Sequence, residues 1–180
     1  MKLPLRYYGD PVLRKIAQPI EEITDEIRQL ATDMIETMEA NKGIGLAANQ
    51  VGRLVRLFVS SMDYEDEEGE VHSQEPEVYI NPVITKPSGA SIERTEACLS
   101  IPELSGPLTR PLTITLEATD LEGNRFAKEC YGYEARCFMH EIDHLNGTLY
   151  VDRIKGKRRK ELEPLLRKIK KKYYKTNSRK

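Results

Sequence analysis

The sequence contains no apolar run of the roughly 18 residues that a membrane helix needs. Charged residues make up 32% of the chain, and the mean hydropathy is −0.56. The first six residues lack the apolar core of a secretory signal, so we expect no export. Cysteine is also scarce, because three cysteines in 180 residues cannot build a disulfide framework. Together these absences predict a cytoplasmic protein in a reducing compartment.

The chain has almost no net charge, but its charges are unevenly distributed. Residues 153–180 hold 14 lysines and arginines against two glutamates, whereas residues 1–152 carry a net charge of −13. A basic C-terminus of this kind can contact an anionic surface such as RNA or a membrane. The alternative is that these side chains only solvate the exposed face of a helix and a frayed end.

Helical patterns are found at both ends of the sequence. Thr24 is a predicted N-cap, and the apolar periodicity after it ends near Asn41–Gly43. A second helix is predicted from Tyr133 to about Leu145, and a last one over Arg158–Tyr173. No repeat or linker divides the chain. We therefore expect a single domain over residues 1–180, with a basic C-terminal helix and tail at 153–180.

Strand patterns lie between these helices. The predicted strands are Leu54–Ser60, Val78–Ile84, Pro111–Thr119 and Arg125–Tyr131. The last two are separated by a polar turn and predict a hairpin. Pro82 predicts that its strand is an edge strand or ends there, and the acidic segment Asp63–Glu75 is predicted to be an exposed loop. Strands in the middle and helices at both ends indicate an α+β fold.

The segment His140-Glu141-Ile142-Asp143-His144 is the strongest local signal. Residues four apart share one face of a helix, so His140 and His144 can present ring nitrogens to one metal ion. Glu141 would then lie beside a water that the metal activates, an arrangement typical of metal-dependent hydrolysis. Only three histidines are present in the chain, so two unrelated surface residues at this spacing are a poor explanation.

The third ligand is not decided by spacing. A catalytic metal site normally has three protein ligands and one open position. A metzincin-type peptidase would need its ligand at position 150, where Tyr150 stands, and Asp152 comes two residues too late. A thiolate would complete a cysteine–histidine–histidine site. Cys98 and Cys137 are both candidates, and Cys137 lies one helical turn before His140.

Residues Gly43–Gln50 form a glycine-containing segment of small and apolar residues. The glycines allow a backbone to approach closely, and the Gln50 amide can donate a hydrogen bond to a developing oxyanion. Taken alone, the segment is more typical of a helix end followed by a packing turn.

Three segments together resemble the motifs of the peptide deformylase family, GxGLAAxQ, EGCLS and HExDHLxG. In this chain they are Gly43–Gln50 (GIGLAANQ), Glu96–Ser100 (EACLS) and His140–Gly147 (HEIDHLNG), in the order that the family has. The resemblance implies an α+β fold with antiparallel sheets packed around a central helix that carries HExxH, plus a C-terminal helix. It also implies removal of the formyl group from N-formyl-methionyl nascent peptides, with release of formate.

The resemblance implies roles for individual residues. Cys98, His140 and His144 are expected to bind one divalent metal, Fe²⁺ first and Zn²⁺, Ni²⁺ or Co²⁺ as alternatives. Glu141 is expected to be the general acid and base. The residues expected to stabilise the oxyanion are Gln50 and, through its backbone N–H, Leu99. Those expected to bind the substrate as an added strand are Gly43, Ile44, Gly45 and Leu46. Glu96 is expected behind the ligands; its pairing with Arg110 is our own hypothesis and no part of a motif.

One residue departs from the family pattern, because Ala97 stands where the family has glycine. If that position needs a positive φ, alanine would cost on the order of 1 kcal/mol and displace Cys98. In an ordinary strand conformation the alanine is harmless.

Two other functions remain as alternatives: a metallopeptidase that cleaves internal bonds, and a non-enzymatic module with a closed metal site. We expect a bacterial or organellar-type translation context, ribosome contact through the basic C-terminus, and neither DNA nor membrane as a partner.

Overall fold

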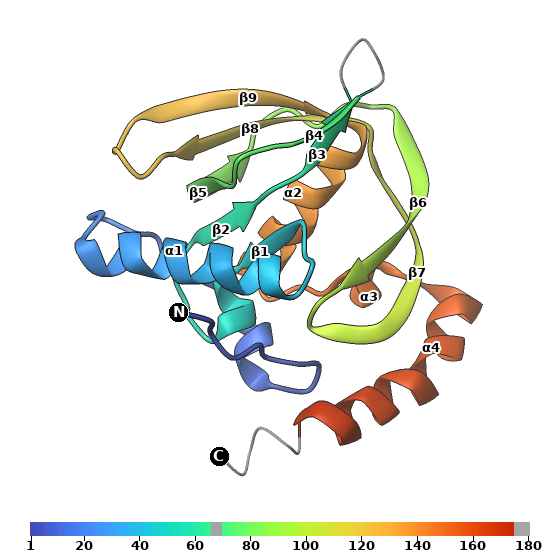
Figure 1. Cartoon of the computed structure of the whole chain (residues 1–180). Helices are drawn as coiled ribbons and strands as arrows, with labels where there is room; N and C mark the ends of the chain where they lie inside the picture. Colours follow the sequence, from blue (N-terminus) through green and yellow to red (C-terminus); the bar gives the residue numbers. More distant parts are fainter. Residues whose placement is uncertain (66–69, 175–180) are drawn as a thin grey trace.

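A computed structural model of the chain describes residues 1–65 and 70–174. Figure 1 shows a strongly curved sheet wrapped around helix α2, with α1 across the front and α4 at the lower edge. The helices are α1 (Asp25–Ala40), α2 (Gly132–Leu145), α3 (Tyr150–Arg153) and α4 (Gly156–Ile169), with short helical turns η1 (Pro11–Arg14), η2 (Ala48–Val51) and η3 (Lys170–Tyr174). The strands are β1 (Gly45–Ala47), β2 (Leu57–Ser60), β3 (Asp63–Glu65), β4 (Val71–Ser73), β5 (Glu77–Ile84), β6 (Ser91–Cys98), β7 (Ile101–Pro111), β8 (Thr113–Thr119) and β9 (Arg125–Tyr131).

The main sheet is antiparallel and has the strand order β1-β2-β5-β8-β9. Side chains alternate between its two faces along each strand. Phe58 and Tyr79 stack on one face and contact Phe138 of α2. Leu57 and Val59 point to the other face and pack in a second core with residues of α1. The sheet therefore separates two helices, and α2 is enclosed on the concave side. The predicted α+β class is confirmed.

The sequence signals at the ends of α1 are visible in the structure. The Thr24 side chain accepts a hydrogen bond from the backbone N–H of Ile27, which caps the helix start. At the other end Lys42 adopts a left-handed φ of 54°, so the chain leaves the helix and enters β1. The predicted helix and both of its ends are confirmed.

Helix α2 follows β9 directly, and Gly132 makes the turn between them with a φ of 58°. Every residue from Ala135 to Leu145 is buried, including both histidines and Glu141. Such complete burial is unusual for a helix with this many ionisable side chains, and each charge needs a partner or a function there.

A second long hairpin, formed by β6 and β7, was not predicted. At the open end of the hairpin Ser91 lies opposite Pro111, and at its tip Cys98 lies opposite Ile101. The register shifts between Ala97 and Cys98. A third core joins β7 to the chain's C-terminal elements, because Leu104 and Leu108 pack with Leu162 and Leu166 of α4. The hairpin thus carries Cys98 at its tip and packs against the C-terminal elements along β7.

Three sequence predictions need correction. Segment 63–75 is not a plain loop, since β3 and β4 pair within it; its residues 66–69 lie outside the described residues. Pro82 marks neither an edge nor a strand end, because β5 lies between β2 and β8. A register shift between Ile80 and Val83, with Asn81 at a φ of 50°, accommodates the proline within the strand. The strand predicted from Leu54 begins at Leu57.

No helix among the described residues is both long enough and apolar enough for a membrane span.

Candidate metal centre and active site

The site lies where three elements meet: the α1–β1 turn, the tip of the β6–β7 hairpin and one face of α2. A cavity of about 510 Å³ opens at this junction. Its volume lies in the range of small-molecule and peptide-residue pockets, about 300–1,000 Å³. The cavity walls include Ile44, Leu99, Ile101, Leu104 and Tyr133 as apolar residues, and they also include Cys98, His140 and Glu141.

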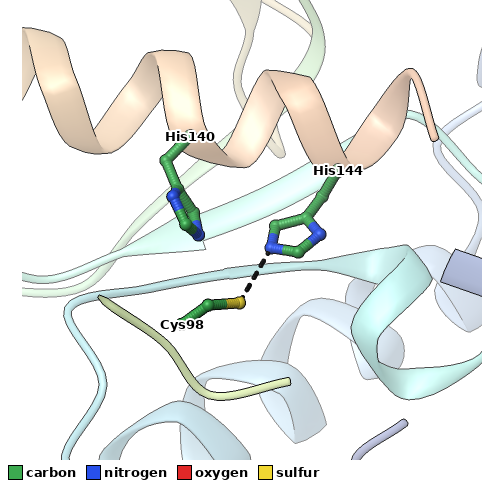
Figure 2. A group of neighbouring side chains, drawn as sticks. All are labelled: Cys98, His140 and His144. Carbon is green, nitrogen blue, oxygen red and sulfur yellow. Dashed lines mark hydrogen bonds between the residues drawn. The ribbon is translucent and has the colours of Figure 1, made fainter. Parts of the chain in front are cut away.

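Cys98, His140 and His144 form a compact group at the base of this cavity. Figure 2 shows the two imidazoles projecting from the same face of α2 toward the thiol, which comes from the hairpin. One ligand atom from each residue lies within 4.8 Å of the others. The Cys98 Sγ lies 3.2 Å from His144 Nε2. The helical spacing of four residues therefore places both rings on one side, as the sequence predicted.

The other two thiols lie elsewhere. Cys137 Sγ lies 3.9 Å from the carbonyl oxygen of Ile44 and 4.0 Å from Ser60 Oγ. Burial raises the pKa of the Cys137 thiol well above its usual value, which disfavours a thiolate. Burial also raises the pKa of Cys130, to about 12. Cys98 is only partly buried and is the cysteine that joins the two histidines.

The donor set fits a divalent transition metal. A thiolate and two imidazoles are the ligands that iron, zinc, nickel and cobalt accept, and three ligands leave one position open for substrate or water. Burial keeps the pKa of His144 well below its usual value, so its ring is neutral and can donate a lone pair. His140 Nδ1 lies 3.1 Å from Glu96 Oε2, which leaves its other ring nitrogen for a metal.

Glu96 is surrounded by hydrogen-bond donors. Its Oε1 accepts from Arg110 Nε and from Arg136 Nη1, both at 2.6 Å, and its Oε2 accepts from Arg110 Nη2 at 2.9 Å. Burial alone would raise the pKa of this carboxyl, but Arg110 and His140 outweigh it and bring the pKa to about 2. Glu96 is therefore a permanently charged acceptor behind His140, and the hypothesised pair with Arg110 is formed.

Glu141 has a different environment. Its side chain is buried against Gly45, and its Oε2 has no hydrogen-bond partner among the described residues. Burial raises the pKa of Glu141 to about 7. A Cβ at Gly45 would lie only 2.5 Å from Glu141 Oε1, so only glycine gives the carboxylate its space there. A carboxyl with a pKa near 7 beside a metal position can both accept and release a proton at neutral pH.

Gln50 is held in one orientation by the backbone. Its Oε1 accepts a hydrogen bond from the N–H of Ala47 at 2.8 Å. The Nε2 group therefore points the other way, 3.6 Å from Cys98 Sγ and 3.2 Å from Ser100 Oγ. The amide donor thus faces the ligand group, where an oxygen held by the metal would receive it.

Comparisons with known proteins agree with this geometry. A family model described as polypeptide deformylase matches residues 2–160. A peptide deformylase from Acinetobacter baumannii (strain SDF) is 45% identical over 167 residues, which cover 93% of this chain and 91% of the relative. The crystal structure of peptide deformylase from Ehrlichia chaffeensis is similar with a TM-score of 0.86 and 34% identity, covering 98% of this chain and 99% of the other.

The chain belongs to the polypeptide deformylase family. Members of this family are metal-dependent hydrolases, and the chain is an enzyme that removes the formyl group from newly synthesised polypeptides. Neither the metallopeptidase nor the non-enzymatic alternative is favoured by this assignment. A third comparison is a crystal structure of a deformylase from Acinetobacter baumannii with Met-Ala-Ser bound, at a TM-score of 0.78 and 30% identity, covering 86% of this chain and 99% of the other.

The four residues expected to bind a deformylase substrate are not equivalent. Gly43, Ile44 and Gly45 line the cavity. Leu46 does not, because its side chain is fully buried in the core shared with α1. Strand β1 is an edge strand of the main sheet, paired only with β2, so its second edge can accept an added strand. Leu99 also lines the cavity, next to Cys98.

The departure from the family motif at Ala97 causes no strain. Ala97 lies in β6 opposite Ser105 and has an ordinary negative φ. The methyl group is exposed at the cavity wall. The cost considered for a positive φ therefore does not apply, and Cys98 keeps its place next to His144.

The sequence analysis missed Arg136 and Ser100. Arg136 lies four residues before His140, on the same face of α2, and this spacing was the available signal. Ser100 is fully buried and contacts Gln50. The sequence pattern gives Asp143 no role beyond its place in the HExxH segment, yet Asp143 accepts hydrogen bonds from Arg110 at 2.9 Å and from Arg153 at 2.5–2.6 Å.

Proposed function

We propose that Cys98, His140 and His144 hold one divalent metal, Fe²⁺ in the cell, and that Glu141 performs the proton transfers of deformylation. When bound, the metal supplies a Lewis acid that polarises the formyl group and activates water. The observation that carries this proposal is the position of a buried carboxylate beside a cysteine–histidine–histidine group, with one oxygen, Glu141 Oε2, that has no partner among the described residues.

The substrate is proposed to bind as an extended peptide along β1. The apolar residues of the cavity suit the side chain of an N-terminal methionine, and the edge of β1 supplies backbone groups. The Met-Ala-Ser complex of the related Acinetobacter baumannii deformylase supports a peptide of this kind as the ligand. Gly43, Ile44 and Gly45 would contact the peptide, and Leu46 only through its backbone.

Glu141 is proposed to take a proton from the attacking water and to give it to the leaving amine. A pKa of about 7 suits both steps, because the carboxyl can hold or release the proton near neutral pH. The Gln50 amide and the backbone N–H of Leu99 are proposed to donate hydrogen bonds to the oxygen that becomes negative. Gln50 is already oriented for this by Ala47.

Formate release tests the reaction. Protein prepared without oxygen and loaded with Fe²⁺ is expected to release formate from a formyl-Met tripeptide and to lose this activity when the metal is chelated. The acetyl-Met peptide and the free-amine peptide are the controls and should release nothing that depends on the enzyme. Cleavage of an internal peptide bond in any of the three would point to a peptidase instead. Parallel loading with Zn²⁺, Ni²⁺ and Co²⁺ ranks the metals.

Metal content tests the ligand set. Cys98→Ser is expected to lower the metal content well below one per chain, because the thiolate is lost. Cys137→Ser is the matched control: it replaces a buried thiol on the same cavity and should keep the metal. Full occupancy in Cys98→Ser together with loss in Cys137→Ser would transfer the ligand role to Cys137.

The basic C-terminus is proposed to contact the ribosome in the cytoplasm, where nascent chains emerge. Helix α4 is amphipathic: Leu162, Leu166 and Ile169 are buried, and most of its lysines and arginines are exposed. Deleting residues 158–180 would remove buried core residues, so charge substitution is the better test. The variant is Lys160, Arg167, Lys168 and Lys171, each changed to Gln. Its control changes four exposed basic residues elsewhere to Gln, namely Lys15, Arg53, Lys86 and Arg125.

The first variant is expected to weaken salt-dependent binding to ribosomes and to leave turnover of a short formyl peptide unchanged. Equal binding by the first variant and its control would show that the C-terminal charges only solvate the helix.

A further inference from the structure

The proposed metal ligands come from two elements that are far apart in the sequence. Cys98 lies at the end of β6, whereas His140 and His144 lie on α2. A three-ligand site keeps its geometry only if these two elements are held at a fixed separation. The contacts between the β6–β7 hairpin and α2 therefore decide where the thiol lies relative to the two rings.

Arg136 is a side chain of α2 that binds both strands of the hairpin. Its Nη2 donates to the carbonyl oxygen of Ile92 on β6 at 2.7 Å, and its Nη1 donates to the carbonyl oxygen of Leu108 on β7 at 2.9 Å. The same Nη1 donates to Glu96 Oε1 at 2.6 Å. Arg136 is 3% exposed, so water does not compete for these bonds. One guanidinium thus joins α2 to both strands of the hairpin.

Arg110 makes the complementary connection. It lies on β7 and reaches α2 through Asp143, with Nη1 donating to Oδ2 at 2.9 Å. Both arginines also bind Glu96, which accepts from His140. Arg110, however, was already expected beside Glu96, and among the described residues its side chain makes no hydrogen bond to a strand carbonyl. Arg136 combines the carboxylate behind His140 with backbone groups of both strands of the hairpin that carries Cys98.

We propose that Arg136 is a positioning residue of the metal centre: it fixes the β6–β7 hairpin against α2 and thereby sets the separation of Cys98 from His140 and His144. The planar guanidinium is suited to this, since its several N–H groups point in fixed directions and can serve three acceptors at once. A lysine keeps the charge, but its N–H donors all lie on one nitrogen at the end of a flexible side chain. The proposal rests on the ligand set given under the proposed function.

Metal affinity and the spectrum of the Co²⁺-loaded protein are the readouts, because neither depends on turnover. The variants are Arg136→Met and Arg136→Lys. Arg136→Met is expected to raise the dissociation constant for Co²⁺ by about 10–100-fold, the usual effect of losing a residue behind a metal ligand. It should also shift or weaken the thiolate-to-cobalt charge-transfer band. Arg136→Lys should lie between Arg136→Met and the parent protein, because the charge beside Glu96 is kept.

Arg153→Met is the matched control. Arg153 lies on α3 and binds Asp143 of α2 at 2.5–2.6 Å, but it makes no hydrogen bond to β6 or β7 among the described residues. It is expected to keep the parent's Co²⁺ affinity within about threefold and the parent's spectrum. An equal loss in Arg153→Met would show that loss of any arginine bound to α2 loosens the site, and this would overturn the proposal.

Parent-like affinity and spectrum in Arg136→Met would also overturn it. If Arg136→Met does not fold, Arg136→Lys decides in the same way, with parent-like values again contradicting the proposal. Cys98→Ser, measured alongside, distinguishes a wrong ligand assignment from a wrong role for Arg136. If it keeps the charge-transfer band, the ligand assignment has failed, and not the role of Arg136.

Discussion

Two buried glutamates lie close to the candidate metal ligands, and their surroundings differ sharply. Glu96 faces the β6–β7 hairpin and accepts four hydrogen bonds, three from arginines and one shared with His140. Glu141 faces β1, where Gly45 leaves it room, and its Oε2 has no partner among the described residues. The pKa of Glu96 is about 2, and that of Glu141 is about 7.

This difference supports the separate roles that we propose for the two carboxyls. A carboxylate saturated by donors cannot exchange a proton near neutral pH, so Glu96 can orient a ligand but cannot catalyse proton transfer. At Glu141 burial outweighs the favourable contacts with His140 and the backbone of Ala47, so this carboxyl is available to bind and release a proton. At Glu96 the contacts with Arg110 and His140 outweigh burial, and this balance distinguishes the two carboxyls.

The largest expected effect comes from Glu141→Gln. The amide cannot transfer the proton, so kcat for a formyl-Met peptide should fall by about 10²–10⁴-fold. Metal content should remain that of the parent, because Glu141 is not among the three ligand residues. Formate release and metal analysis on the same sample check this. Near-normal turnover with metal bound would remove Glu141 from the proton-transfer role.

Gly45→Ala tests the space around Glu141. A Cβ there would lie 2.5 Å from Glu141 Oε1 and 3.0 Å from Cys137 Sγ, so the carboxylate must move. Because displacements of about 1 Å cost up to 10²-fold in rate, kcat should fall by about 10- to 10²-fold. The control is Gly89→Ala, where an added Cβ meets nothing within 4 Å. Equal kcat in both variants would mean that Glu141 needs no fixed position.

Glu96→Gln tests the carboxylate that is surrounded by hydrogen-bond donors. It leaves Arg136 without its carboxylate partner and Arg110 with Asp143 as its remaining one, and it weakens the orientation of His140, so metal affinity should fall by about 10–100-fold. Competition with a chelator of known affinity measures this. Turnover per bound metal should fall far less than in Glu141→Gln. Unchanged metal affinity would show that the hydrogen bond to His140 Nδ1 is dispensable.

The low pKa of Glu96 predicts how the stability of the metal-free protein depends on pH. The pKa of this carboxyl is about 2 in the folded protein and 4.5 in its ordinary state, so the folded state favours the charged form. The resulting stabilisation is fully present above pH 4.5 and is lost as the pH falls through 2. A depression of this size corresponds to about 3 kcal/mol in the free energy of unfolding. Urea unfolding from pH 5 to 2 should therefore show a steeper decline in the parent than in Glu96→Gln. Parallel curves would contradict the low pKa.

The smallest effect is expected at Ala97, which lies in β6 between Glu96 and Cys98. Because its φ is negative, the alanine is unstrained, and Ala97→Gly should change metal content and kcat by less than about twofold. A several-fold rise in kcat or metal content after Ala97→Gly would mean that the methyl group displaces Cys98. KM for peptides of different second residue is the more sensitive readout, because Ala97 lines the cavity.

The helical half of the site was predictable from local spacing, whereas the hairpin half was not. His140 and His144 are four residues apart in one apolar-periodic helix, so their common face, with Glu141 beside it, follows from 3.6 residues per turn. Strand β7 also alternates, with buried residues at every second position from Leu104 to Arg110. Two of these inward positions are occupied by Gly106 and Arg110, which erases the hydrophobic pattern on which strand prediction depends.

The assignment of Cys98 likewise depended on resemblance, since nothing local distinguished it from Cys137. Their difference is a matter of long-range packing: one lies at a hairpin tip opposite His144, the other faces Ser60 of β2. Arg136 was overlooked for a related reason, because its acceptors lie on two strands that were not predicted as a pair.

The most direct test of the division between the two glutamates is a joint measurement of metal content and formate release on Glu96→Gln and Glu141→Gln. The two variants are expected to show opposite patterns of metal content and formate release. Glu141→Gln should hold a full complement of metal and release formate at least 10²-fold more slowly. Glu96→Gln should lose metal under limiting supply while each bound metal keeps much of the parent's turnover. If both variants lost metal and turnover in the same proportion, the two carboxylates would share one role, and the account would be wrong.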